Sequence, residues 1–175
     1  MKPEFKFLHP NDFTQEIKDQ IIDLGKRSGV WQESDIEYYK KQFPNPRNIN
    51  IVYQNEEGLI TGFILARPHN EAVLDYLVED PKMTKSDTGM FYIDHVGVDE
   101  SVSGKFLGLH LIIEMIKEAN KRGVFRFSAH CRVINGLSKV IQRKFRAGVD
   151  VVRRIEEYTD CNNEPCDYLE IEVVL

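Results

Sequence analysis

The sequence predicts a mixed α/β domain of the α+β kind, with a central sheet of about seven strands flanked by about four helices. Segments in which apolar and polar residues alternate, as in strands, are interspersed with segments whose apolar residues recur every three or four positions, as in helices. Their order along the chain is β-α-α-β-β-β-α-β-α-β-β. No linker, internal repeat or low-complexity tract interrupts this order, which favours one domain over residues 1–175.

The first elements are a strand and two helices. Residues 4–9 predict the strand. Asp12 and Gln15 form a capping pair before a helix with an apolar stripe made of Phe13, Ile17, Ile21 and Leu24. A capping box at residues 34–37 begins the second helix, which the prolines at 44 and 46 end.

A hairpin and a less readable segment follow. Alternating residues at 49–53 and 59–66, joined by a turn at 55–58, predict the hairpin. Residues 72–78 fit either a short helix or a strand, because short apolar runs do not separate the two. The polar residues 79–88 predict a long loop, which is either a solvated surface insertion or a flap over a substrate.

The most informative stretch is residues 91–123, which predicts a strand, a glycine-bearing loop and a long helix. Gly97 lies inside the strand, where glycine often marks a bulge or a close approach of a ligand or another backbone. Gly123 is placed to end the helix, whose apolar stripe is Leu111, Ile112, Met115, Ile116 and Ala119. Such a junction presents backbone N–H groups at the positive end of a helix dipole, so it is a candidate phosphate site.

The rest of the chain predicts a strand at 125–131 and a helix at about 136–146. Two closing strands, at about 149–157 and 167–175, flank a turn that contains Asn162, Asn163 and Pro165.

Composition predicts a cytoplasmic globular protein. The residues are 42% hydrophobic and 29% charged, and no run of 18 apolar residues indicates a membrane span. The net charge of −5 argues against nucleic-acid binding. Cys161 and Cys166 flank a short turn, but nothing nearby completes a zinc site, so we expect reduced cysteines and no metal.

At the loop, the sequence resembles a divergent member of the GNAT acyltransferase superfamily. The family's core reads valine, about four loop residues, then Arg/Gln-x-x-Gly-x-Gly/Ala and a helix. Val98 corresponds to the valine, and the motif is occupied by Ser103, Gly104, Lys105, Phe106, Leu107 and Gly108. Gly108 matches the last glycine, whereas Ser103 replaces Arg/Gln and Phe106 replaces the first glycine. The order of elements along essentially the whole chain strengthens the resemblance.

The resemblance implies a GNAT-like fold in which the two central parallel strands, here 91–98 and 125–131, splay apart. It implies acetyl-CoA as co-substrate, with the pantetheine arm bonded to the backbone of Val96, Gly97 and Val98. The pyrophosphate would lie at the N–H groups of residues 103–108. Asn135 matches an asparagine that contacts the arm, although it also suits the N-cap of the next helix.

Acyl transfer to an amine needs a base for the amine and donors near the thioester. Asp94 is the first candidate base, because many members carry a carboxylate at the matching place, and Tyr92 is the second. The alternatives are a structural carboxylate and a packed tyrosine. His95 and His130 read as structural. The family's usual acid, a tyrosine, corresponds here to Gln142 or Lys144, which puts the standard mechanism in doubt.

The sequence says less about the acceptor. In the family the first two helices and the loop between them line its site, so Trp31 and Tyr39 are candidates, with core packing as the alternative. Asp75 is a further candidate, as one of the acidic residues of the segment 67–89. The acidic residues of the segment 67–89 would favour a cationic acceptor if it folds over the cleft, but a solvated acidic face explains them equally.

Three functions follow from the resemblance. The first is an N-acetyltransferase acting on a primary amine of a small molecule or protein. The second is a catalytically degenerate domain that binds acyl-CoA or a partner without turnover. The third is an acyltransferase acting on charged tRNA, against which the acidic charge balance counts. A membrane partner is not expected, and the oligomeric state is left open, with a homodimer among the options.

Overall fold

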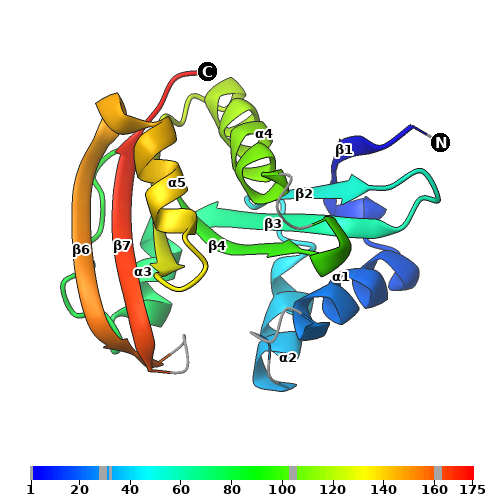
Figure 1. Ribbon diagram of the computed structural model, residues 1–175, viewed down its shortest axis with the longest axis horizontal. Helices are drawn as coiled ribbons and strands as arrows, with labels where there is room; N and C mark the ends of the chain where they lie inside the picture. Colours follow the sequence, from blue (N-terminus) through cyan, green and yellow to red (C-terminus); the bar gives the residue numbers. More distant parts are fainter. Residues whose placement is uncertain (1, 28–30, 32, 103–105, 160–162) are drawn as a thin grey trace. The chain divides into compact units, whose positions relative to one another are not determined.

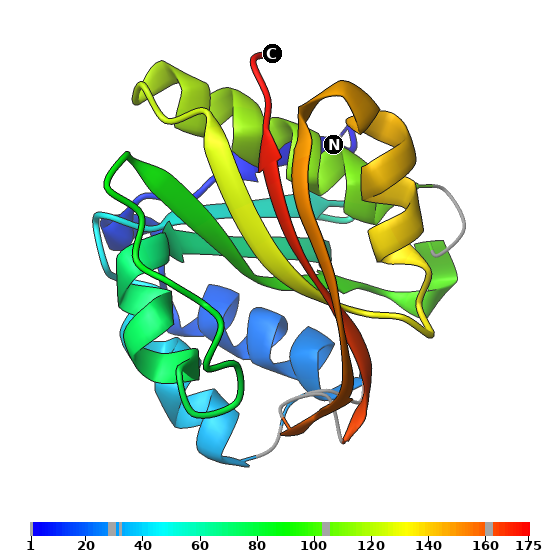
Figure 2. The same cartoon turned by 90° about the vertical axis from the view of Figure 1, so that its left-hand side faces the viewer.

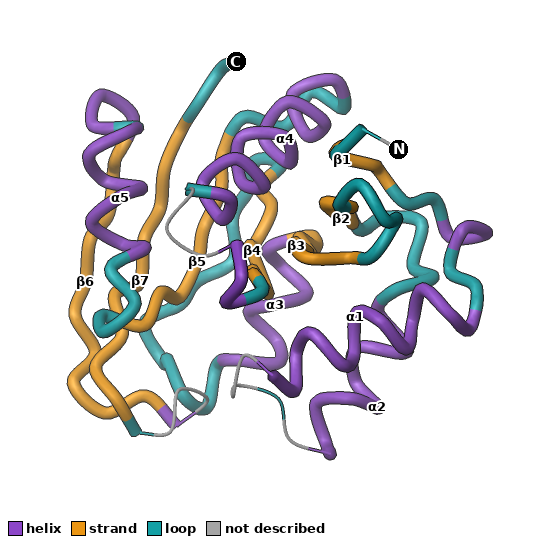
Figure 3. Tube along the Cα trace, turned by 45° about the vertical axis from the view of Figure 1, so that its right-hand side comes forward, coloured by secondary structure: helices purple, strands orange, loops and turns teal. Residues whose placement is uncertain are grey.

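The computed structural model describes residues 2–27, 31, 33–102, 106–159 and 163–175. Its helices are α1 (Gln15–Arg27), α2 (Glu33–Gln42), α3 (His69–Tyr76), α4 (Leu107–Lys121) and α5 (Leu137–Lys144). The strands are β1 (Glu4–Phe7), β2 (Ile49–Gln54), β3 (Ile60–Pro68), β4 (Met90–Val98), β5 (Arg126–Arg132), β6 (Val149–Tyr158) and β7 (Glu164–Glu172). Short 3₁₀ helices lie at Pro10–Asp12, Glu100–Val102 and Arg146–Gly148. Figure 3 colours helices purple and strands orange.

The strands follow the order β1-β2-β3-β4-β5-β7-β6 in one seven-stranded sheet. The pair β4–β5 is parallel, whereas β1–β2, β2–β3, β5–β7 and β6–β7 are antiparallel. This mixed sheet confirms the predicted fold class. The described residues hold five α-helices instead of about four, because α3 forms in the segment where helix and strand could not be separated. No helix in the described part of the chain is long and apolar enough to cross a membrane.

Contacts within the chain group it into two compact units. Unit 1 comprises Met1–Ala66 and His95–Met115, and unit 2 comprises Arg67–Asp94 and Ile116–Leu175. The division falls inside β4, between Asp94 and His95, and inside α4. The single domain expected over residues 1–175 stays a prediction.

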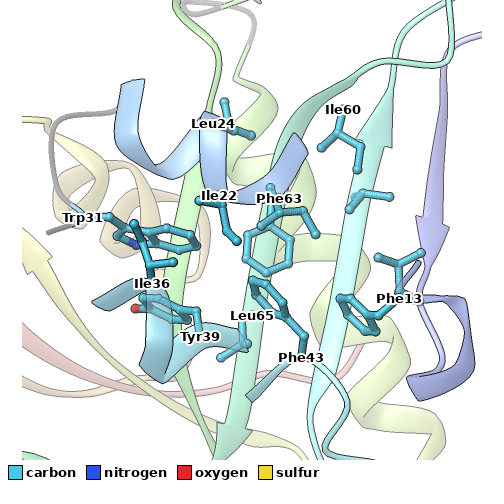
Figure 4. Packing of buried hydrophobic residues seen from close by; sticks show 13 residues of the cluster. Phe13, Ile22, Leu24, Trp31, Ile36, Tyr39, Phe43, Ile60, Phe63 and Leu65 are labelled. Carbon is cyan, nitrogen blue, oxygen red and sulfur yellow. The ribbon is translucent and has the colours of Figure 1, made fainter. Parts of the chain in front are cut away.

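Unit 1 is built on the β2–β3 hairpin. Figure 1 shows α1 and α2 lying along one face of this hairpin. Figure 4 shows their apolar side chains packed together with Phe63 and Leu65 of β3. The rings of Phe13 and Phe43 stack at 5.3 Å, and Phe43 is fully buried. Burial of one such side chain contributes about 2 kcal/mol, so this cluster holds both helices on the hairpin.

Unit 2 contains the first half of β4 and the strands β5, β7 and β6, of which the last three lie side by side in Figure 2. Helix α3 packs on this part of the sheet through a smaller cluster. The cluster joins Ala72 and Val73 of α3 to Tyr92 of β4 and Tyr168 of β7. Helix α3 is therefore held by tertiary packing, which overrides the ambiguous local pattern.

Three details differ from the sequence-based expectation. Helix α2 begins at Glu33, so the capping box predicted at residues 34–37 does not begin it. The capping pair of Asp12 and Gln15 is wrong. The Asp12 carboxylate instead accepts a hydrogen bond from the backbone N–H of His9, whereas Thr14 Oγ1 accepts one from the N–H of Ile17 and so caps α1. The last strand begins at Glu164 and includes Pro165. A proline is tolerated there because the register of β6 with β7 is irregular at that end.

Candidate functional site

The parallel ladder between β4 and β5 ends inside unit 2. It pairs Met90 with Arg126 and continues to Ile93 opposite Ala129. Beyond this rung β5 continues its ladder with β7 as far as Arg132. Asp94, the next residue of β4, has a fully buried side chain although the residue as a whole is partly exposed, so its exposed part is the main chain. Polar backbone is therefore open where the two central strands stop pairing.

The Asp94 carboxylate itself is engaged by two groups. The Tyr76 hydroxyl donates to Oδ1 at 2.7 Å, and Nε of Arg67 lies 3.3 Å from Oδ2. The Arg67 side chain is 1% exposed and also bonds Asp75, whose side chain is 48% exposed. Asp94 is thus half of a buried ion pair in unit 2, and its assignment as the catalytic base stays a prediction.

Tyr92, the second candidate base, is linked to two groups that the sequence did not single out as catalytic. Its hydroxyl lies 2.9 Å from Nδ1 of His130, and Nε2 of His130 lies 3.0 Å from Oδ2 of Asp80. The same oxygen of Asp80 accepts a hydrogen bond of 2.5 Å from Arg153. Tyr92, His130 and Asp80 are all buried, so they form a continuous polar chain inside unit 2.

The electrostatics of this chain are set by burial and by its own hydrogen bonds. Burial is the main reason that the pKa of His130 falls below its usual value, with the Asp80 carboxylate acting in the opposite direction. Burial alone would raise the pKa of Asp80, but hydrogen bonds from His130 and Arg153 outweigh it and hold that pKa well below the usual range. At neutral pH this polar chain of side chains therefore contains the neutral imidazole of His130 beside the carboxylate of Asp80.

In unit 1, the N-terminus of α4 lies close to the end of β4. The backbone N–H of His110 donates to the carbonyl of Phe106, so Phe106 stands at the first turn of the helix. A Cβ added to Gly108 would lie 3.7 Å from Cγ1 of Val96 and 3.8 Å from Cγ2 of Val98. Ser103, Gly104 and Lys105 lie outside the described residues. The predicted phosphate site is therefore described at its helical end, residues 106–108.

Gly97 serves the packing of unit 1. A Cβ at this position would lie 2.9 Å from Nε2 of His95, so glycine makes room for that ring. The Nδ1 atom of His95 accepts a hydrogen bond of 3.2 Å from the Trp31 indole. Burial lowers the pKa of His95 to about 4, so its imidazole is neutral at neutral pH.

The predicted acceptor residues are found in different surroundings. Trp31 and Tyr39 stack at 4.2 Å between ring centroids and belong to the buried cluster of unit 1 (Figure 4). This is the core packing that the sequence left as the alternative. Asp75 lies in unit 2 and bonds Arg67. A role for these three residues in binding an acceptor stays a prediction.

The sequence model of the Acetyltransferase (GNAT) family matches residues 15–138. The chain belongs to this family. The comparison with curated proteins finds no matching sequence.

Solved structures of the family share the fold. A chain of the NatC complex bound to Gag peptide and CoA is 15% identical, with a TM-score of 0.71 over 99% of this chain and 100% of that one. An aminoglycoside 6'-N-acetyltransferase complexed with coenzyme A is 16% identical, with a TM-score of 0.67 over 98% of both chains. The ribosomal-protein-S18-alanine N-acetyltransferase from Escherichia coli is 15% identical, with a TM-score of 0.65 over 98% and 96%. At such identities the likeness concerns the fold.

Two positions at which the chain departs from the GNAT pattern are described. Phe106, which replaces a motif glycine, has a φ of 55° and a side chain that is 65% exposed. It thus adopts the left-handed conformation that glycine takes easily. Gln142, one of the two residues that correspond to the family's tyrosine, donates to Ser138 Oγ at 2.8 Å inside α5.

The N-cap of α5 is Gly136, so the N-cap role that the sequence suggested for Asn135 is wrong, although Asn135 still bonds the first turn. Its side-chain oxygen accepts a hydrogen bond of 2.9 Å from the N–H of Leu137, at the start of α5. Asn135 is exposed, and a contact with the cofactor arm stays a prediction.

We expect Phe106→Gly to stabilise the protein by about 1 kcal/mol, because a left-handed conformation costs a non-glycine residue roughly 1–2 kcal/mol. The melting temperature should then rise by about 2–4 °C. Phe106→Ala is the matched control, since it removes the exposed ring but keeps a Cβ at positive φ, and it should bring no gain. Thermal unfolding followed by circular dichroism measures both, and equal stability of the two variants would contradict the strain.

The sequence missed the polar chain for a physical reason. Asp80 lies in a loop, Tyr92 and His130 lie on different strands, and no local spacing brings such residues together. The sequence offered only a weak signal: Ser128 and His130 share one parity, so a polar face on β5 could be read from it.

Among the described residues, no group of three or more His, Cys, Asp or Glu side chains is placed to hold a metal ion.

Proposed function

We propose that the chain is an acetyl-CoA-dependent N-acetyltransferase, which moves an acetyl group to a primary amine of a small molecule or protein by direct attack in a ternary complex. The observation that carries this proposal is the end of the β4–β5 ladder at Ile93 and Ala129, in a chain that belongs to the GNAT family. Open strand backbone at this place can bond the amides of an extended acyl carrier, much as a further strand would.

Two features of unit 1 suit coenzyme A. Val96 and Val98 of β4 are partly exposed, and the pantetheine arm would bond the backbone there. The first-turn N–H groups of α4 have no partners within the helix, and with the helix dipole they suit a pyrophosphate. Gly108 adds no side chain there. The NatC structure and one aminoglycoside 6'-N-acetyltransferase structure contain CoA, which supports the same ligand class here.

The reaction needs a neutral amine, and it needs a group that accepts the N–H proton which the amine loses as its nitrogen bonds to the acetyl carbon. The amine nitrogen attacks the thioester carbonyl, and the carbon–sulfur bond breaks to release coenzyme A as its thiolate, which takes up a proton from solvent. Tyr92 and Asp94 stay the candidate proton acceptors, and both lie beside the last rung of the β4–β5 ladder. The Asp94 carboxylate pairs with Arg67 and Tyr76, and the Tyr92 hydroxyl bonds His130.

Charge gives less guidance on the acceptor than the sequence suggested. Of the acidic residues in the segment 67–89, Asp80 is buried against His130 and Arg153, and Asp75 bonds Arg67. These carboxylates are neutralised inside unit 2, so an attraction for cationic acceptors cannot be inferred from them. We therefore propose a primary amine without specifying its carrier.

We expect the purified protein to release coenzyme A thiol from acetyl-CoA when it is incubated with a panel of primary amines. The panel should include aminoglycosides, polyamines and peptides with free α-amino or lysine groups. Thermal shift with coenzyme A serves as the binding control, and saturation at about 100 times Kd should add roughly 2.7 kcal/mol of stability. Stabilisation by coenzyme A without transfer to any amine would contradict the proposal and favour a degenerate binding domain. The replaced motif residues Phe106 and Gln142 would then explain the loss.

A further inference from the structure

The polar chain in unit 2 crosses the last rung of the β4–β5 ladder. Tyr92 immediately precedes Ile93, and His130 immediately follows Ala129, so the bond of 2.9 Å from the Tyr92 hydroxyl to Nδ1 of His130 spans that rung. Asp80 continues the chain on the far side of the imidazole, at 3.0 Å from Nε2. A phenol, an imidazole and a carboxylate thus stand in line, beginning where the open strand backbone begins.

The hydrogen bonds of this chain have a fixed direction. Asp80 is ionised, so it can only accept, and Nε2 of the neutral imidazole must carry the proton. The Nδ1 atom is then an acceptor, and the Tyr92 hydroxyl donates to it. This is the hydrogen-bond order found where a carboxylate orients an imidazole to take a proton from a hydroxyl group.

The other groups around His130 do not compete for its ring nitrogens. Tyr158 of β6 stacks on the imidazole at 4.6 Å, and the Tyr168 ring of β7 lies at 4.9 Å. Tyr76 of α3 lies at 6.1 Å, and Tyr168 donates its own hydroxyl to Glu170. The rings hold the imidazole plane in place, so both nitrogens keep their partners.

Two positive or titratable groups also face this ring. Arg153 of β6 binds the Asp80 carboxylate at 2.5 Å and disfavours a second positive charge on His130. His69 of α3 has the same sign of effect when it is protonated, but burial lowers the pKa of His69 as well. The carboxylate of Asp80 is the group that favours an imidazolium, through its hydrogen bond and its charge.

We propose that Asp80, His130 and Tyr92 form a proton relay that removes the proton of the acceptor amine. This inference rests on the proposed N-acetyltransferase function. As the amine nitrogen bonds to the acetyl carbon, its N–H bond breaks and the proton passes to the Tyr92 oxygen, directly or through one water. The Tyr92 proton moves in the same step to Nδ1 of His130. The resulting imidazolium is paired with the Asp80 carboxylate, and it gives its proton to solvent once coenzyme A has left as the thiolate.

In this relay Tyr92 is the residue that meets the amine, and His130 and Asp80 are positioning residues that act through it. Tyr92→Phe keeps the ring and removes the hydroxyl. His130→Gln keeps a donor for Asp80 but removes the basic nitrogen that would take the Tyr92 proton. Each change should lower kcat for acetyl transfer by about 100-fold, within the usual contribution of a general base. The double variant should lose no more than about threefold beyond the worse single variant, because the two residues act as one unit.

His69 offers a matched control in the same unit. It is buried like His130, its Nε2 atom bonds the carbonyl of Thr84 at 2.8 Å, and its Nδ1 atom lies 2.7 Å from Ser128 Oγ. His69→Gln keeps a donor for Thr84 and lies outside the relay. It should change kcat by less than about threefold, against the 100-fold expected for a proton relay.

The pH profile distinguishes a relay from a structural role. The relay needs neutral His130, so kcat should fall as pH drops through the pKa of His130, below the ordinary value of about 6.5. Asp80→Asn removes the charge that favours the imidazolium. It should lower the plateau of kcat and move this acidic limb to lower pH. His130→Gln and Tyr92→Phe should remove the limb, and His69→Gln should leave it in place.

The experiment uses the full chain with acetyl-CoA and the best amine of the panel, and calorimetry with coenzyme A checks that binding is retained. An active wild type whose Tyr92→Phe and His130→Gln variants keep both kcat and the acidic limb overturns the relay alone. A wild type that acetylates no amine overturns the proposed function, and the relay with it. If His130→Gln does not fold, Tyr92→Phe decides, because it removes a single hydroxyl group.

Discussion

Gly108→Glu should abolish the binding of coenzyme A while the fold stays intact. The new carboxylate would lie in the first turn of α4, where the pyrophosphate is proposed to meet the backbone N–H groups. Juxtaposed like charges cost several kcal/mol, so affinity should fall by about 100-fold or more. An acidic side chain near a helix N-terminus favours the helix itself. Unfolding is therefore not the expected cause of the lost affinity, which calorimetric titration with coenzyme A measures.

Gly108→Ala is the matched control. Its Cβ would make ordinary contacts of 3.7 and 3.8 Å with Val96 and Val98, so the position has room for a methyl group. Alanine also favours a helix over glycine by about 1 kcal/mol. The melting temperature of this variant should rise by up to about 4 °C, and its affinity for coenzyme A should fall by less than about tenfold. If the Gly108→Glu variant bound coenzyme A as tightly as the wild type, the proposed phosphate site at the N-terminus of α4 would be contradicted.

The sequence predicts those elements best that carry a long periodic pattern. Helix α4 has an apolar stripe several turns long and ends before Gly123, whose φ of 76° gives the expected left-handed end. Helix α3 has eight residues and a short apolar run, and what decides it is packing of Ala72 and Val73 against strands far along the chain. Local pattern is a strong signal only where it repeats over several turns.

The candidate site likewise has one part that the local sequence predicts and another that depends on contacts between distant residues. The strand and the helix within residues 91–123 could be placed because consecutive residues form them, and Phe106 has a positive φ at the place of a motif glycine. The surroundings of Asp94 and Tyr92 could not be placed. Arg67 and His130 reach them through the folded sheet, and burial changes the charge and the hydrogen bonds that each group can make.

Asp94→Asn should destabilise the protein by about 3 kcal/mol, because it leaves the buried guanidinium of Arg67 without its buried partner. The partly exposed Asp75 still binds Arg67, which limits the loss. The melting temperature should fall by about 6–12 °C. Tyr76→Phe is the control without a charge change: it removes one hydrogen bond to Asp94 and should cost about 1–2 kcal/mol.

Kinetics and a double variant separate the two roles of Asp94. If its role is to hold Arg67, then Arg67→Met combined with Asp94→Asn should be more stable than Asp94→Asn alone, because no buried charge is left unpaired. The folded Asp94→Asn enzyme should then keep kcat/KM within about threefold of wild type, far from the 10²-fold loss typical of a missing base. A loss of at least about tenfold at a temperature where the variant is fully folded would make Asp94 the base. In that case Tyr92→Phe should turn over like the wild type, and the proton of the amine would leave through the Asp94 carboxylate.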